Sequence, residues 1–126
     1  MIDLRDKRIL VTGGAGFLGR SVVAALQRRG AKDLFIPRRR DFDLTREADA
    51  ARLLAQARPQ VVLHLAAEVG GILANQRNPG RYFFANMAMA LHMIEQSRIS
   101  GVEKFVQVGT ICAYPKFTPV PFREDD

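Results

Sequence analysis

The sequence predicts an open, doubly wound parallel sheet of the α/β class, with helices on both faces. Apolar, strand-like runs alternate with helix-like segments along the 126 residues. A glycine-rich turn at residues 13–19 joins the first apolar run to the first helical segment, and the apolar run at 61–65 is typical of a strand buried on both faces. Because crossovers between parallel strands are right-handed, successive helices are expected to cover both faces of the sheet.

The glycine turn follows a predicted strand at 8–12 and leads directly into a helix. Gly13 can adopt backbone angles closed to other residues, Gly16 leaves room for a phosphate, and Gly19 lets the helix lie close to the strand. The amide groups of the first helical turn, at the positive end of the helix dipole, favour a pyrophosphate. We therefore predict a dinucleotide site formed by Gly13, Gly14, Ala15, Gly16, Phe17, Leu18 and Gly19, against the alternative of a loop that binds nothing.

Two short elements follow the turn. The first helix is predicted over residues 17–29 and is closed by Gly30. A second strand is predicted at 34–36, and it stops at Pro37 because proline cannot continue the hydrogen-bonded ladder. The basic residues 38–40 follow Pro37 directly, so they lie at the carboxyl end of this strand.

A second helix is predicted to end near Ala57, two residues before Pro59. Thr45 is expected to be its N-cap, because a threonine hydroxyl can accept a hydrogen bond from a free amide group of the first turn. Helical spacing puts small and apolar side chains on one face and charged side chains on the other. The predicted apolar face consists of Ala48, Ala51, Leu54 and Ala55.

The second half of the chain repeats the alternation. The strand at 61–65 is followed by a stretch of small residues at 66–74 and then by a long helix at 79–97, whose first position is a proline. Gly101 separates this helix from a fourth strand at 104–108. The sequence ends before a fifth strand, which leaves the fourth strand as an open edge. We expect residues 1–126 to be the N-terminal part of a longer Rossmann domain that binds NADP; the alternative is that another chain covers the edge.

Composition narrows the class of protein. The chain is 48% hydrophobic and 25% charged, as expected for a globular domain, and it has no apolar run of about 20 residues that would span a bilayer. A single cysteine excludes an internal disulfide and favours a cytoplasmic location. The net charge is +6, but the basic residues are spread over several segments without the long basic stripe of nucleic-acid proteins. We expect no nucleic-acid partner, no membrane partner and no metal site.

The residues after the second strand favour NADP over NAD. The sequence there is Arg38, Arg39 and Arg40, whereas proteins that bind NAD usually carry a carboxylate at this position to hold the ribose hydroxyls. Arg38 and Arg39 are the predicted ligands of the 2′-phosphate, because guanidinium groups form paired, charged hydrogen bonds with phosphate. Asp41 is near enough to serve NAD instead, so a solvated arginine loop is the alternative. The adenine is expected beside Asp43 and Leu44, and the cofactor beside Leu65, Ala66 and Ala67.

The glycine turn and the segment at 64–67 resemble the extended short-chain dehydrogenase/reductases, a family of sugar-nucleotide epimerases and dehydratases. Three more segments, at 69–75, 101–106 and 109–116, are similar to the branch of that family that epimerises and reduces GDP-4-keto-6-deoxy-D-mannose. The resemblance covers nearly the whole chain, and the segment at 109–116 is much more specific than the glycine turn.

The resemblance implies an activity and a set of site residues. One site would epimerise two carbons that flank a keto group, after which NADPH would deliver hydride to that group. Cys112 matches the cysteine that takes part in proton transfer, although a lone cysteine is more often a small buried hydrophobe. Thr110 matches a hydroxyl residue that hydrogen-bonds the substrate carbonyl. Asn86, Val108 and Gly109 match positions near the cofactor.

The chain departs from the family in its catalytic residues. The Tyr-x-x-x-Lys motif, which supplies the proton for reduction, is absent, and Tyr114 does not replace that tyrosine because Thr118 lies four residues later. The catalytic histidine of the family is expected beyond residue 126, and His64 and His92 are predicted to be structural. We therefore expect this chain by itself not to catalyse the reaction. Other members of the family, or a non-catalytic module that binds NADP, are the alternative assignments.

The long helix carries a broad apolar stripe that has two possible uses. It can belong to the core of the domain, which is the more common use, or it can face a second subunit. The resemblance implies that this helix contributes to a homodimer. The stripe consists of Tyr82, Phe83, Met87, Ala90, Leu91 and Ile94.

Overall fold

The computed structural model describes residues 3–110, 113–115 and 117–124. Its four strands form one parallel sheet in the order β2-β1-β3-β4, which confirms the predicted fold class. Central pairings run through Leu10, which lies opposite Phe35 on one side and Val62 on the other. The strands are β1 (Arg8–Thr12), β2 (Asp33–Phe35), β3 (Val61–His64) and β4 (Lys104–Gln107).

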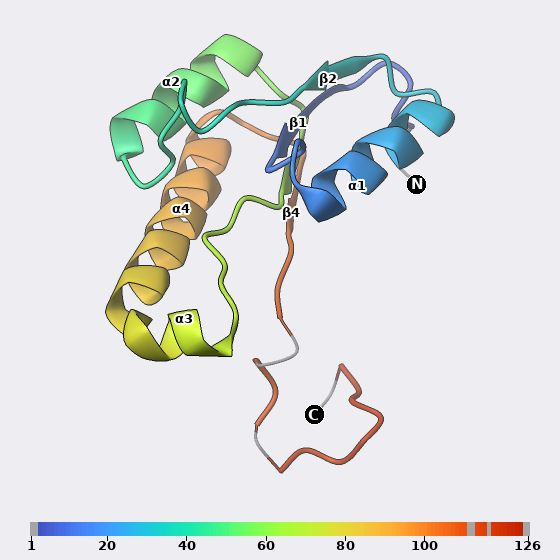
Figure 1. The fold of residues 1–126 in the computed structure, drawn as a ribbon. Helices are drawn as coiled ribbons and strands as arrows, with labels where there is room; N and C mark the ends of the chain where they lie inside the picture. The colour runs from blue at the N-terminus through green and yellow to red at the C-terminus, as the bar shows by residue number, and fades with distance from the viewer. Residues whose placement is uncertain (1–2, 111–112, 116, 125–126) are drawn as a thin grey trace.

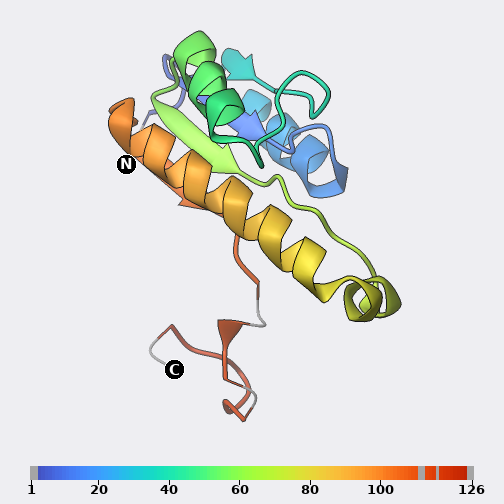
Figure 2. The same ribbon diagram turned by 90° about the vertical axis from the view of Figure 1, so that its left-hand side faces the viewer.

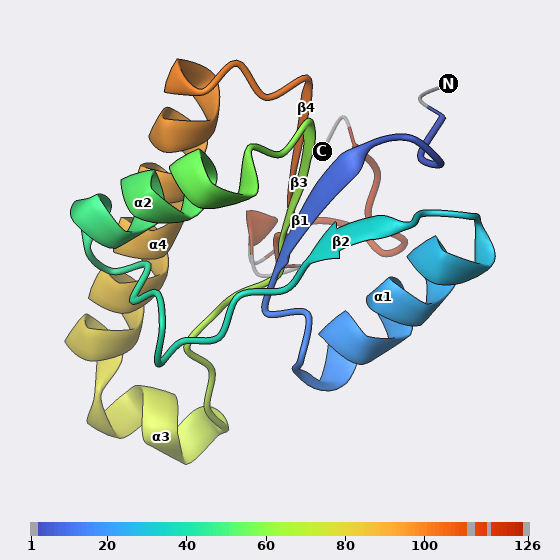
Figure 3. The same cartoon turned by 90° about the horizontal axis from the view of Figure 1, so that it is seen from above.

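Helices cover both faces of the sheet, as predicted. Helix α1 (Phe17–Arg28) lies on one face, and α2 (Glu47–Ala57) and α4 (Pro79–Ile99) lie on the other (Figure 3). Figures 1 and 2 show that α4 continues past the end of the sheet to a short helix, α3 (Ile72–Arg77), which the sequence did not predict. The parallel strands all end at the same edge of the sheet, so the loops after β1, β2 and β3 meet there.

Alternating side chains of the strands build two separate cores. On the α1 side, Ile9 and Val11 of β1 are fully buried and pack with Leu26 of α1. On the other side, Leu10 and Val62 pack with residues of α2 and α4. The larger cluster consists of Leu10, Phe42, Leu44, Ala50, Leu53, Leu54, Val62, Met89 and Met93. The sheet is therefore covered on both faces, in agreement with the apolar run seen in β3.

Helix α2 corrects two expectations. Its N-cap is Arg46 and not Thr45, and no side chain within the described residues caps it. The Thr45 hydroxyl instead donates to Asp43 Oδ1 at 2.7 Å, and a hydroxyl engaged in this turn is drawn away from the helix. The predicted apolar face was also rotated. Ala48 and Ala55 are exposed, whereas the buried face consists of Ala50, Leu53 and Leu54, because the two large leucine side chains determine which way the helix turns.

Most of the apolar stripe on α4 lies outside the core. Phe83, Met87, Leu91 and Ile94 are between 49% and 71% exposed, while α4 buries Ala85, Met89, Met93 and Ser97 against the sheet and α2. Of the two uses that the sequence leaves open for the stripe, these four side chains do not take the first, since they lie outside the core of the described chain. Helical periodicity found a shared face, but helix α4 carries two apolar faces and buries the one with the smaller and more flexible side chains.

The far edge of the sheet is open within the described part of the chain. There β4 pairs with β3 alone, through Val62 opposite Phe105 and Leu63 opposite Val106. The segment after β4 leads away from the sheet (Figure 1). Within residues 3–110, 113–115 and 117–124, none of the helices has the length and apolarity needed to cross a bilayer.

Candidate cofactor site

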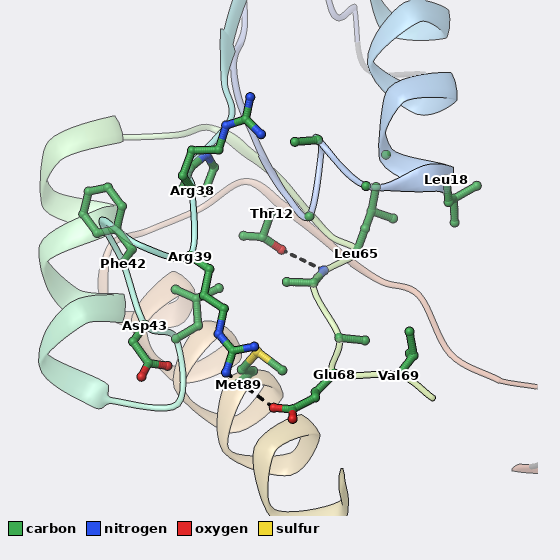
Figure 4. Close-up of a pocket in the computed structure, with 18 of the residues that line it drawn as sticks. Thr12, Leu18, Arg38, Arg39, Phe42, Asp43, Leu65, Glu68, Val69 and Met89 are labelled. Atoms are coloured by element: carbon green, nitrogen blue, oxygen red, sulfur yellow. Dashed lines mark hydrogen bonds and ion pairs between the residues drawn. The ribbon is translucent and has the colours of Figure 1, made fainter. Parts of the chain in front are cut away.

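A cavity of about 620 Å³ lies at the carboxyl ends of β1, β2 and β3. Its walls come from the glycine turn, the loop after β2, the loop after β3 and one side chain of α4 (Figure 4). Of the predicted cofactor residues, the cavity is lined by Gly13, Ala15, Gly16, Phe17, Leu18, Gly19, Arg38, Arg39, Asp43, Leu44, Leu65, Ala66 and Ala67. The structure thus brings together residues that are up to 54 positions apart in the sequence, since Gly13 and Ala67 line the same cavity.

Two glycines make the turn compact. Gly13 has a φ of 69°, and a Cβ atom there would lie 2.8 Å from the main-chain nitrogen of Ala66. A Cβ atom on Gly19 would overlap the carbonyl oxygen of Gly13 and would lie 2.6 Å from Gly14 Cα. Both positions therefore require glycine for the approach of backbone to backbone. This agrees with the roles predicted for Gly13 and Gly19.

The first turn of α1 faces the cavity through Phe17, Leu18 and Gly19. No side chain of the described residues caps this helix, and its first turn contains no acidic residue. Its first amide groups and its dipole therefore present partial positive charge to the cavity without an internal anion to neutralise it. The arrangement suits an anionic ligand such as a pyrophosphate.

A buried pair connects the ends of β1 and β3. Thr12 Oγ1 lies 2.7 Å from His64 Nδ1, and the Ala66 amide donates to the same hydroxyl at 3.3 Å. Both side chains are completely buried. Burial lowers the pKa of His64 to about 4, so the imidazole is neutral at pH 7. Thr12 thus fixes the start of the loop that carries Ala66 along the cavity wall.

The three arginines after β2 occupy different surroundings. Arg38 and Arg39 line the cavity, whereas Arg40 is not among its described lining residues and lies 3.6 Å from Asp41. Figure 4 shows that Arg38 and Arg39 point in different directions, and Arg39 extends toward Glu68, with Nη2 3.5 Å from Glu68 Oε2. Arg38 also borders a second hollow. The predicted cofactor residue Gly14 lines this hollow and is not among the described lining of the main cavity.

Internal contacts fix the loop after β2. Arg52 places its guanidinium 4.3 Å from the ring centroid of Phe42 and donates to the Asp41 carbonyl at 2.6 Å. The Asp43 amide donates to Asp49 Oδ2 at 3.0 Å, and the hydrogen bond from the Thr45 hydroxyl holds the pKa of Asp43 below its usual value. Asp43 is therefore an anion on the cavity wall, and its hydrogen bonds with Asp49 and Thr45 determine its position.

Some predicted residues lie elsewhere. Asn86 does not line the described cavity, but its side chain accepts a hydrogen bond from the Glu68 amide at 2.8 Å and donates to the Glu68 carbonyl at 2.9 Å. Val108 and Gly109 follow β4 and lie outside the described lining, and Thr110 is exposed in the segment beyond them. Cys112 lies outside the described residues. Their proposed roles therefore remain predictions.

Several residues of the cavity were not predicted from the sequence. Glu68 and Val69 lie three and four residues after the end of the predicted strand, so their place beyond its carboxyl end was a usable signal. Met89 had no such signal, because its position depends on how α4 crosses the sheet. The missed lining residues are Thr12, Pro37, Phe42, Thr45, Glu68, Val69 and Met89.

Comparison with known proteins agrees with this geometry. Residues 9–126 match a family model described as the NAD dependent epimerase/dehydratase family. GDP-L-fucose synthase of Sinorhizobium fredii is 37% identical over 99% of this chain and 40% of its own length, and GDP-L-fucose synthase 1 of Arabidopsis thaliana is 35% identical over 95% and 37%.

Solved structures give the same result. A GDP-L-fucose synthetase from Naegleria fowleri bound to NADP has a TM-score of 0.80 at 26% identity. The match covers 96% of this chain and 36% of the synthetase chain. The GDP-mannoheptose C4 reductase MlghC from Campylobacter jejuni, with NADP bound, has a TM-score of 0.86 at 26% identity over 93% and 37%. This chain therefore spans about two fifths of the length of the curated relatives, at 40% and 37%. From the match over residues 9–126, the chain belongs to the NAD dependent epimerase/dehydratase family.

Proposed function

We propose that this chain forms the NADP-binding part of an epimerase/reductase that converts GDP-4-keto-6-deoxy-D-mannose to GDP-L-fucose. The observation that carries the proposal is the cavity of about 620 Å³ beneath an uncapped helix, with two arginines on its wall. The names of the similar proteins support the GDP-sugar substrate and the NADP cofactor. The residues fit the cofactor, since Gly13 and Gly19, where an added Cβ atom would meet backbone atoms, keep the glycine turn compact beside the cavity.

Each wall of the cavity has a proposed role in holding NADP(H). The amide groups at the start of α1 bind the pyrophosphate, and Arg38 binds the 2′-phosphate. Asp43 and Leu44 bind the edge and the face of the adenine. Ala66 and Ala67 let the cofactor lie close to the backbone after β3.

The bound cofactor would supply hydride to the 4-keto carbon after epimerisation at carbons 3 and 5. Cys112 is proposed to move protons at the carbons beside the keto group, and Thr110 to donate its hydroxyl hydrogen to the keto oxygen. Reduction also needs an acid at the alkoxide, and the chain contains no Tyr-x-x-x-Lys motif to supply it. We therefore propose that this chain by itself binds cofactor without turning over the keto-sugar. A non-catalytic module that binds NADP is the second candidate; the missing motif favours it if residues 1–126 are the whole natural protein and disfavours it if they are part of a longer chain.

Replacing Arg38 with alanine tests the cofactor assignment. By calorimetric titration, the unsubstituted protein is expected to bind NADPH more tightly than NADH. Arg38→Ala should weaken NADPH binding by roughly tenfold or more, because the charged hydrogen bonds to the phosphate are lost, and should leave NADH binding unchanged. Arg40→Ala is the matched control, since Arg40 pairs with Asp41 and should keep both affinities. Failure of the unsubstituted protein to bind either nucleotide would overturn the proposed function.

The exposed stripe of α4 supports a homodimer. Phe83, Met87, Leu91 and Ile94 form an exposed apolar face, and such faces mark protein interfaces more often than free surface. Leu91→Glu is expected to convert a dimer to a monomer in sedimentation velocity, because it would bury a charge in the interface. Ala55→Glu, on the exposed side of α2, is expected to leave the sedimentation coefficient unchanged. A monomeric unsubstituted protein would contradict the homodimer.

A further inference from the structure

Glu68 is the acidic residue of the cavity that no assigned role explains. Its side chain is only 16% exposed, and it lines the cavity that we assign to NADP(H). Asn86 holds the main chain of Glu68 from both sides, because its side chain accepts a hydrogen bond from the Glu68 amide and donates one to the Glu68 carbonyl. A carboxylate fixed inside a site for a polyanionic ligand is unfavourable unless cations neutralise it. Among the described residues, Arg39 and Arg81 contact Glu68, and their contacts differ in length.

Arg81 of α4 is the strong partner of Glu68. Its Nε donates to Glu68 Oε1 at 2.7 Å, and its Nη2 lies 2.7 Å from the same oxygen. Arg39 is the weak partner, since it offers one long contact of 3.5 Å; the two arginine side chains are similarly exposed, at 71% and 66%, so the length of the contact distinguishes them. A contact of this length between charged groups, with one side in solvent, contributes little free energy. Arg39 can therefore leave Glu68 at low cost, whereas Arg81 remains.

We propose that Glu68 determines cofactor specificity by competing with the 2′-phosphate of NADP(H) for Arg39; this inference rests on the proposed function. Arg39 adjoins Arg38, the proposed ligand of that phosphate, and Figure 4 shows Arg39 turned away from Arg38 and toward Glu68. Binding of a phosphate dianion draws Arg39 from the carboxylate, because phosphate accepts stronger charged hydrogen bonds. Arg81 makes the exchange possible, since Glu68 keeps a partner after Arg39 leaves.

Two substitutions are expected to change NADPH affinity in opposite directions. Glu68→Gln keeps the size of the side chain but releases Arg39, and should raise NADPH affinity about threefold relative to NADH affinity. Arg81→Gln leaves Glu68 dependent on Arg39, and should lower NADPH affinity about threefold relative to NADH affinity. Arg98→Gln is the matched control. Arg98 lies on the same helix and pairs with Glu95 at 2.7 Å, and neither residue is among the described lining of the cavity.

The measurement is calorimetric titration of the protein at its natural length with NADPH and NADH, repeated with 2′,5′-ADP and 5′-AMP to isolate the 2′-phosphate. The inference is supported if the ratio of the two affinities rises in Glu68→Gln and falls in Arg81→Gln for both ligand pairs. It is overturned alone if the unsubstituted protein prefers NADPH and Glu68→Gln changes neither affinity, or changes both equally, which would indicate a purely structural wall. If the unsubstituted protein binds no nucleotide, the proposed function falls and this inference falls with it.

Discussion

Gly19→Ala is expected to abolish measurable NADPH binding, with a loss of at least about a hundredfold in affinity, or roughly 3 kcal/mol. The added methyl group would overlap the Gly13 carbonyl oxygen and lie 2.6 Å from Gly14 Cα. Both neighbours are backbone atoms, so no side-chain rotation relieves the contact. Helix α1 must therefore move away from β1, which displaces the amide groups proposed to bind the pyrophosphate. The same overpacking should lower the free energy of unfolding by about 1–3 kcal/mol.

Two further glycines serve as graded controls in the same titration and in urea unfolding. A Cβ atom on Gly16 would meet the Gly13 carbonyl oxygen at 3.2 Å, so Gly16→Ala should have a smaller effect than Gly19→Ala. A Cβ atom on Gly80, in the first turn of α4, would have no described atom within 4 Å, so Gly80→Ala should leave both affinity and stability unchanged or slightly improved. NADPH affinity in Gly19→Ala equal to that of the unsubstituted protein would show that the glycine turn is not the pyrophosphate site.

The sequence predicted those parts of the fold that depend on local patterns. The turn at 13–19 was recognisable because a strand, three spaced glycines and a helix follow one another directly. The boundaries of β3 and α4 differ from the predicted ranges by one or two residues, since Pro79 marks the start of the helix and Gly101 its end. Proline and glycine act on the backbone at their own positions, which is why they can be read without knowledge of the rest of the fold.

Features that depend on contacts between distant segments were not predictable. Thr45 was predicted to cap α2 because threonine is a common N-cap residue, and the prediction is wrong because the Thr45 hydroxyl donates to Asp43 in the folded loop. The bridge of Arg39, Glu68 and Arg81 joins three segments whose approach depends on the crossing of α4 over the sheet. Periodicity on α4 likewise identified residues that share a face. Which other element covers that face depends on how the whole chain folds.

His64 gives the chain a predicted dependence of stability on acid. Its pKa is about 4 in the folded state, because burial disfavours the charged imidazole, against 6.5 as the reference value for the unfolded chain. The folded pKa is the lower one, so the contribution of neutral His64 to stability is fully present above pH 6.5. This contribution is lost as the pH falls from 6.5 to about 4, because in this range the unfolded chain binds a proton at His64 and the folded chain does not.

The expected loss across this window is on the order of 3 kcal/mol, measured as the free energy of urea unfolding at a series of pH values. His64→Gln should be less stable at pH 7.5, because it disturbs the pair with Thr12 at 2.7 Å, but its stability should fall much less between pH 6.5 and 4.5. His92→Gln, which keeps His64, should retain the slope of the unsubstituted protein. If His64→Gln retained that slope as well, another group would take up the proton. The buried pair of Thr12 and His64 would then not be the cause of the loss of stability in acid.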